Sequence, residues 1–165
     1  MKRKKTNNTF SCIIAISLLL LSYGCIDQTD LAVFQKEASV PNFEWTYKYQ
    51  PSFSFQIKDT SALYDLFITI RHTNRYPYNN LWLLIHSAYQ GAKPTEKRVE
   101  LPLTDETGQW LGAGMDDIYQ HRIPIQQNAK FDSMGTYHIT LEQNMRINPL
   151  PNVMAVGLRV EKTTP

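Results

Sequence analysis

The chain has 165 residues, a formal net charge of +2 and two cysteines. Its basic character is local: four of the 17 basic residues lie in the first five positions, and all 15 acidic residues follow residue 24. Residues 25–165 therefore hold 13 basic and 15 acidic residues, a net charge of −2. No run of Lys and Arg remains there, which argues against a nucleic-acid partner.

The first 24 residues have the order of a secretory signal peptide. Lys2 to Lys5 are basic, residues 10–21 are apolar, and Ser22 and Gly24 are small. The apolar stretch is shorter than the roughly 20 residues that span a bilayer. We therefore expect residues 1–24 to be removed.

Cys25 ends this segment, as in a bacterial lipobox. The position is irregular, because Leu21 lies four residues before the cysteine and Ser22 occupies the usual leucine position. We predict cleavage before Cys25, a diacylglycerol group on its thiol and an acyl group such as palmitate on its new amine. The alternatives are a conventional signal peptide with an incidental cysteine, or an uncleaved anchor. Acyl chains contribute about 0.8 kcal/mol per buried CH₂ group, so the lipid bilayer becomes a partner.

Cys12 would leave with the signal, so Cys25 is the one cysteine after cleavage. An intramolecular disulfide, a thiolate-rich zinc site and a Cys–His nucleophile are then excluded. We expect no metal and no cofactor. Residues 25–32 form a short lipidated leader, and residues 33–165 are long enough for one domain held together by packing.

The domain is predicted to consist of strands. Alternation of apolar and polar residues indicates half-buried strands, and runs that are apolar on both faces indicate central ones. In chain order, alternation marks residues 53–58, 136–141 and 154–161, the central candidates are 63–70 and 81–85, and the weaker candidates are 99–103 and 118–125. Pro102 and Pro124 favour strand ends or sheet edges for the last two. Residues 142–147 allow one helical turn. Frequent turn signals make the fold class all-β, an antiparallel β-sandwich of about eight strands.

No catalytic motif appears in this sequence. The four histidines after residue 24 have no metal-ligand spacing, so we expect them on sheet surfaces: His72, His86, His121 and His138. Asp116 and Asp117 are adjacent loop carboxylates, and a hydrolase that uses either of them is the least favoured reading. We predict that the protein is not an enzyme.

Aromatic side chains in loops are the remaining candidates for contact with a partner or ligand. Trp110 among glycines is favoured as a core residue, but Trp82, Trp110, Tyr76 and Tyr78 are also candidate platforms for a surface glycan. A rigid sandwich presents its function on loops, so the segments 75–80 and 112–117 are the predicted contact surface. The candidate contact residues are Arg75, Tyr76, Tyr78, Asn79, Asn80, Trp82, Trp110, Asp116 and Asp117.

Four segments carry a resemblance to a known family. They are residues 65–83 (DLFITIRHTNRYPYNNLWL), Gly108-x-Trp110-x-Gly112-x-Gly114, Asn144-Met145-Arg146 before Leu150-Pro151, and residues 156–159 (VGLR). Together with the signal and Cys25, they resemble the GldH-type gliding-motility lipoproteins of the Bacteroidetes, in the same order and over nearly the whole chain.

The resemblance implies a non-enzymatic cell-envelope lipoprotein associated with gliding motility and the linked type IX secretion machinery. Other envelope proteins of that apparatus are then its expected partners. The expected location is a membrane of the envelope, on the periplasmic or surface face, with the outer membrane favoured. A surface glycan-binding sandwich is the alternative.

Overall fold

The computed structural model describes residues 32–89 and 91–163. The predicted signal peptide, Cys25 and nearly all of the leader lie outside these residues. Within them, no helix has the length and apolar character needed to cross a membrane.

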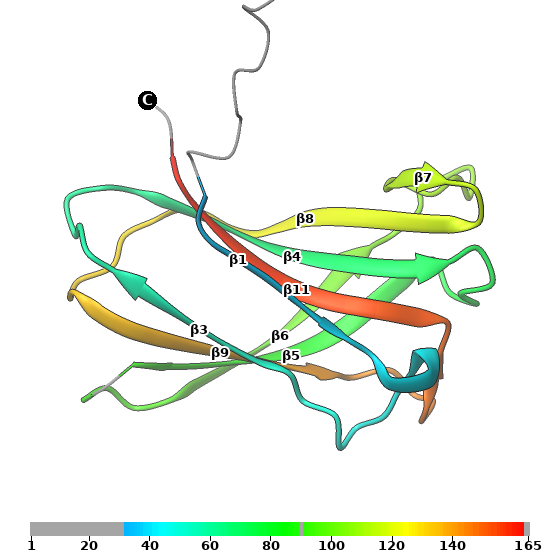
Figure 1. The fold of residues 1–165 in the computed structure, drawn as a ribbon, viewed down its shortest axis with the longest axis horizontal. Helices are drawn as coiled ribbons and strands as arrows, with labels where there is room; N and C mark the ends of the chain where they lie inside the picture. Colours follow the sequence, from blue (N-terminus) through cyan, green and yellow to red (C-terminus); the bar gives the residue numbers. More distant parts are fainter. Residues whose placement is uncertain (1–31, 90, 164–165) are drawn as a thin grey trace, which may run out of the picture. The chain divides into compact units, whose positions relative to one another are not determined.

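Two antiparallel sheets face each other and form the two layers of a β-sandwich (Figure 1). In spatial order, the five-stranded sheet contains β1 (Ala32–Ser39), β11 (Val153–Lys162), β4 (Tyr64–Thr73), β8 (Ile118–Ala129) and β7 (Ala113–Met115). The four-stranded sheet contains β3 (Ser52–Ile57), β9 (Gly135–Gln143), β5 (Asn80–Tyr89) and β6 (Thr95–Pro102). A 3₁₀ turn, η3 (Pro41–Phe43), and a small ladder of β2 (Glu44–Trp45) with β10 (Leu150–Pro151) complete the fold. The predicted all-β sandwich is confirmed, with eight long strands and three short ones in the described residues.

The alternation read from the sequence is the reason that these strands form a sandwich. In β3, Phe53, Phe55 and Ile57 are buried while the residues between them are exposed. β4 and β5 each lie between two long neighbours, which agrees with their predicted central positions. Their apolar side chains and those of β11 fill one core between the layers.

The prolines lie where strand pairing tolerates a missing N–H group. Pro102 ends β6, an edge strand of the four-stranded sheet. Pro124 lies in β8 beyond the three residues that β7 pairs, so that side of the strand needs no ladder bond there.

Two sequence expectations differ from the structure. Residues 142–147 form no helical turn: Glu142 and Gln143 end β9, and the chain then continues as a loop because Gln143 accepts the Met145 N–H and donates to the Ile147 carbonyl. β1 was not predicted, because its residues alternate poorly and it pairs only with β11 at the edge of the sheet.

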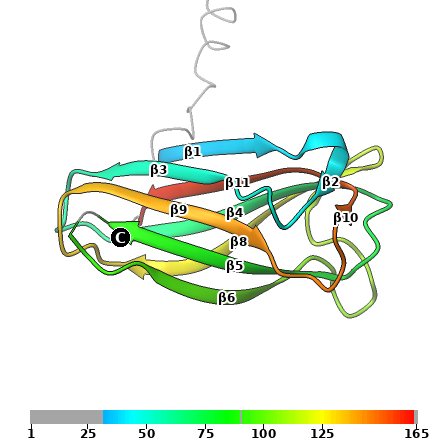
Figure 2. The same cartoon turned by 90° about the horizontal axis from the view of Figure 1, so that it is seen from below.

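The strands of both sheets run between two ends of the sandwich, and Figure 2 shows both ends. We call the end where β1 begins the entry end; there Ala32 pairs with Glu161 near the end of β11. It comprises the start of β1, residues 58–63, 91–94 and 130–134, and Lys162. The far end comprises residues 40–51, 74–79, 103–117 and 144–152.

Candidate functional site

The two loops predicted as a contact surface meet at the far end. Residues 74–79 connect β4 to β5, and residues 103–117 lead from β6 through β7 to β8. The Asn74 N–H donates to the Asp117 carbonyl at 2.7 Å, and the Leu103 N–H donates to the Asn79 carbonyl at 2.9 Å. The fold therefore joins these loops into one surface, although they are separated in the sequence.

Most of the predicted contact residues belong to this surface, but their exposure differs. Arg75 and Asn79 are exposed, as are Asp116 and Asp117. Tyr76 is buried, with its hydroxyl donating to the Asn80 carbonyl at 2.9 Å, so it shapes the loop from within. Trp82 lies on the outer face of the four-stranded sheet, where its carbonyl accepts the Asn144 N–H at 2.8 Å. Tyr78, Asn80, Trp82 and Trp110 are half-buried.

A buried cluster of rings lies beneath these loops. His72 of β4 and His121 of β8 are 0% and 2% exposed, which corrects the expectation that all four histidines lie on sheet surfaces. The ring of Trp110 lies 4.4 Å from that of His72 between centroids, and the ring of Tyr76 lies 5.1 Å from it. His72 has its ring turned inward because it lies on the same face of β4 as the buried Leu66, Ile68 and Ile70. His138 is exposed and His86 is half-buried. Trp110 packs against the core, as the favoured interpretation predicted.

The two buried histidines have one consistent arrangement of protons. His72 Nδ1 lies 2.8 Å from the Thr73 carbonyl oxygen, which only accepts, so this nitrogen donates. In the neutral ring, His72 Nε2 then accepts from His121 Nε2–H at 2.9 Å. Burial lowers the pKa of His72, and burial together with the neighbouring His72 lowers the pKa of His121 to about 4. Both rings are therefore neutral near pH 7 and hold β4 to β8 beneath the far-end loops.

The Trp residues do not form a shared platform in the described chain. The Arg98 guanidinium lies over the Trp82 ring, 4.0 Å from its centroid, so one face of that ring is covered. Trp110 is surrounded by the rings of His72, Tyr119 and Tyr76. One face of the Trp82 ring is therefore unavailable to a sugar, and Trp110 packs among other rings.

The carboxylates at the far end form no catalytic pair with a described partner. Asp116 has a φ of 54° and turns the chain from β7 into β8. Asp117 is exposed, and its backbone carbonyl holds Asn74. Across residues 32–89 and 91–163, no three His, Cys, Asp or Glu side chains come together as a metal site would require.

Sequence reasoning missed a second exposed part of the far end. Phe43 is 46% exposed and has a φ of 59°, a strained value for a bulky side chain. Tyr47 and Ile147 are also exposed, and Tyr47 is joined to the neighbouring loop through its hydroxyl bond to the Met145 carbonyl. Leu111 and Met115 add to the exposed apolar side chains at this end. These five residues come from three separate segments of the sequence, so only the folded structure shows that they lie at the same end.

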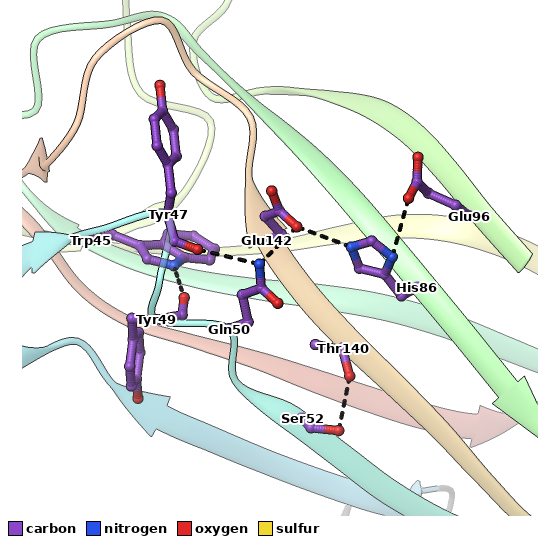
Figure 3. A network of polar contacts seen from close by, with 9 residues as sticks. All are labelled: Trp45, Tyr47, Tyr49, Gln50, Ser52, His86, Glu96, Thr140 and Glu142. Atoms are coloured by element: carbon purple, nitrogen blue, oxygen red, sulfur yellow. Dashed lines mark hydrogen bonds and ion pairs between the residues drawn. The ribbon is translucent and has the colours of Figure 1, made fainter. Parts of the chain in front are cut away.

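A polar network runs from this part of the far end along the four-stranded sheet (Figure 3). His86 lies between Glu142 and Glu96, with N–O distances of 3.1 and 3.3 Å, and Gln50 donates to the same Glu142 oxygen at 2.8 Å. The buried Trp45 indole N–H donates to the Tyr49 carbonyl. Because these residues come from β2, β5, β6, β9 and a connecting loop, no sequence pattern announces the network.

The geometry thus defines a class of protein: a β-sandwich whose far end carries joined loops and exposed aromatic side chains over a rigid, buried base. Comparison with known proteins places it further. The GldH lipoprotein family matches residues 32–160, and the chain belongs to that family. It is therefore a gliding-motility lipoprotein by family, which places it at a membrane of the cell envelope.

Two relatives match over nearly their full lengths. A gliding motility lipoprotein GldH homolog of Christiangramia forsetii is 31% identical, covering 94% of this chain and 98% of the relative. The gliding motility lipoprotein GldH of Flavobacterium johnsoniae is 26% identical, covering 92% and 96%. No solved structure matches the chain.

Proposed function

We propose that this protein is a non-enzymatic interaction component of the gliding-motility apparatus and of the type IX secretion machinery linked to it. Its proposed organisation is a signal peptide over residues 1–24, a lipidated leader over 25–32 with the acyl groups on Cys25, and a β-sandwich over 33–165. The observation that carries the proposal is the family match over residues 32–160 of the sandwich, whose far end carries the exposed aromatic side chains of Phe43 and Tyr47.

The far end is the proposed contact surface for another envelope protein. Protein interfaces are enriched in aromatic residues and Arg at their centres, and Phe43, Tyr47, Arg75 and Tyr78 supply both kinds of side chain here. A shared membrane raises the local concentration of a tethered protein and its partner, so a modest surface is sufficient. The proposed site is the outer membrane, with the sandwich on its periplasmic or surface side.

Lipidation is tested with Cys25→Ser. We expect loss of metabolic labelling by a palmitate analogue and release of the protein from the membrane fraction, because no acyl chain remains to hold it. Normal labelling of the variant would refute Cys25 as the lipid site.

Partner binding is tested by crosslinking in intact cells. We expect Phe43→Ser with Arg75→Glu to abolish the crosslinked partner and colony spreading while protein abundance stays normal. The matched control is Gln56→Ser with Lys36→Glu, which changes exposed strand residues away from the far end. Unchanged spreading, adhesin secretion and envelope composition after deletion of the gene would refute the proposed role.

A further inference from the structure

The sandwich has opposite charges at its two ends. The entry-end loops 58–63, 91–94 and 130–134 hold three lysines (Lys58, Lys93 and Lys130) and two acidic residues (Asp59 and Asp132), a net charge of +1, and Lys162 of β11 is paired with Asp59. The far end holds three basic and five acidic residues, a net charge of −2. Within the described residues, Lys58, Lys93 and Lys130 form no ion pair, so their charges are available to an outside anion. The described sandwich is therefore electrostatically polarised along its strands.

Exposed apolar side chains accompany the lysines at the entry end. Met134 is 66% exposed and Leu63 is 41% exposed, and both lie in the loops that carry Lys130 and Lys58. Val33 is 43% exposed at the start of β1. Basic residues beside protruding apolar ones match the boundary between phospholipid headgroups and acyl chains.

A largely apolar cleft of about 300 Å³ lies between the two sheets near this end. Phe55, Leu66 and Ile139 belong to its wall, and Lys93 and Lys130 also line it. The Phe55 ring also packs against Phe34 of β1, with 5.8 Å between the ring centroids, so the cleft lies close to the first strand of the sandwich. Phe55, Leu66 and Ile139 are already buried, so a membrane surface at this end would meet the lysines of the cleft and not its apolar wall.

The length of chain outside the sandwich determines which end lies near a lipid on Cys25. Seven residue steps separate Cys25 from Ala32, and they span at most about 24 Å when fully extended. The twelve-residue strand β8 is roughly 40 Å long. A lipid anchor at residue 25 therefore holds the entry end at the membrane and leaves the far end free to point away from it. This step rests on the acylation proposed above.

We propose that the entry end is a docking face for anionic phospholipids. Lys58, Lys93 and Lys130 contact headgroup phosphates, and Met134 and Leu63 enter the boundary with the acyl chains. The docked domain then stands on its membrane with its strands upright and its far end directed toward envelope partners. The lipid tether supplies attachment, and this face supplies orientation.

The test uses the mature acylated protein in vesicles of phosphatidylcholine alone and of phosphatidylcholine mixed with phosphatidylglycerol. An environment-sensitive fluorophore is attached through Met134→Cys at the entry end or through Leu111→Cys at the far end; acylated Cys25 does not react. We expect the emission at Met134→Cys to shift to the blue in the anionic vesicles, and the emission at Leu111→Cys to remain that of a probe in water.

Charge reversal separates headgroup binding from simple tethering. We expect Lys58→Glu with Lys93→Glu and Lys130→Glu to lower the ratio of docked to undocked protein roughly a hundredfold or more and to abolish the shift. The matched control, Lys36→Glu with Lys48→Glu and Arg146→Glu, makes the same change in net charge away from the entry end and keeps the shift.

Two results would overturn the proposal, and they are distinguishable. In the first, the protein sediments with anionic vesicles but the emission of the Met134→Cys probe is the same as that of the Leu111→Cys probe in water. The protein is then acylated but does not dock by this face. A protein that sediments with neither kind of vesicle lacks the proposed acylation, and labelling of a free Cys25 would show this directly.

Discussion

Because His72 and His121 are buried as neutral rings, the stability of the fold is expected to fall as the pH becomes mildly acidic. Both side chains have folded-state pKa values below the ordinary value of 6.5, and that of His121 is lowered to about 4. The unfolded chain therefore binds more protons than the folded one below about pH 6.5, so stability is complete above that pH and is lost as the pH falls toward 4.

The size of the effect follows from the two pKa values of His121, the ordinary value of 6.5 in the unfolded chain and about 4 in the folded one. Between about pH 7.5 and pH 5, His121 alone would lower the free energy of unfolding by about 2 kcal/mol. His72 changes stability in the same direction, because a proton on its Nε2 would face the Nε2–H of His121 and break their hydrogen bond. A loss of 2 kcal/mol corresponds to roughly 5 to 10 °C in Tm for a domain of this size.

The assay is urea unfolding of the mature protein at several pH values, followed by tryptophan fluorescence. Hydrogen bonds to the Ser61 and Thr107 side chains lower the pKa values of Asp59 and Asp105, so these carboxylates affect stability only below about pH 4 and leave the window above pH 5 to the histidines.

His121→Gln is the informative variant, because its amide can still donate to His72 but does not titrate. We expect this variant to lose less stability than the wild type on acidification. His138→Gln, on the exposed face of β9, is the control and should follow the wild type. A wild-type stability that does not change between about pH 7.5 and pH 5, or an unaltered pH dependence in His121→Gln, would refute the assignment of a neutral buried pair.

Two further predictions concern the pairing of β11 with β1 and β4. Gly157→Ala should destabilise the fold by about 1 to 3 kcal/mol, measured by denaturant unfolding. The new Cβ would press against Thr69 Oγ1 and lie 2.6 Å from the Lys36 carbonyl oxygen. An unchanged unfolding midpoint would contradict this close packing. Thr69→Val should raise the stability by about 1 kcal/mol in the same assay, because the buried Thr69 hydroxyl has no hydrogen-bond partner among the described residues. A loss of stability would show that this hydroxyl is satisfied.

Local patterns were sufficient to predict most of the sandwich. β3, β9 and β11 alternate in the sequence as they do in the fold, and β4 and β5 are apolar because both of their neighbours are strands. β1 was missed because an edge strand with one long neighbour needs no regular apolar face. The predicted direction of the His72 and His121 side chains was also wrong. A polar residue in a strand is expected on the solvent face, but here each ring has a hydrogen-bond partner on the neighbouring strand.

The candidate site depended on information that no single segment contains. The loops at 75–80 and 112–117 were predicted individually from their aromatic and glycine residues, and the strand order brings them together at the far end. The exposure of Phe43 and Tyr47 depends on how η3 and the loop after β2 pack, so neither side chain stood out in the sequence.

The position of β1 has a mechanical consequence. Seven of its eight residues pair with β11 over Ala32–Ser39, and the strand runs from the entry end toward the far end. A pull between a membrane-held leader and a partner gripped at the opposite end acts along the axis of this strand. Its rungs are then loaded together in shear instead of being unzipped one after another, which is the geometry in which a pair of strands resists tension best. A component of a moving cell surface would carry load through this ladder.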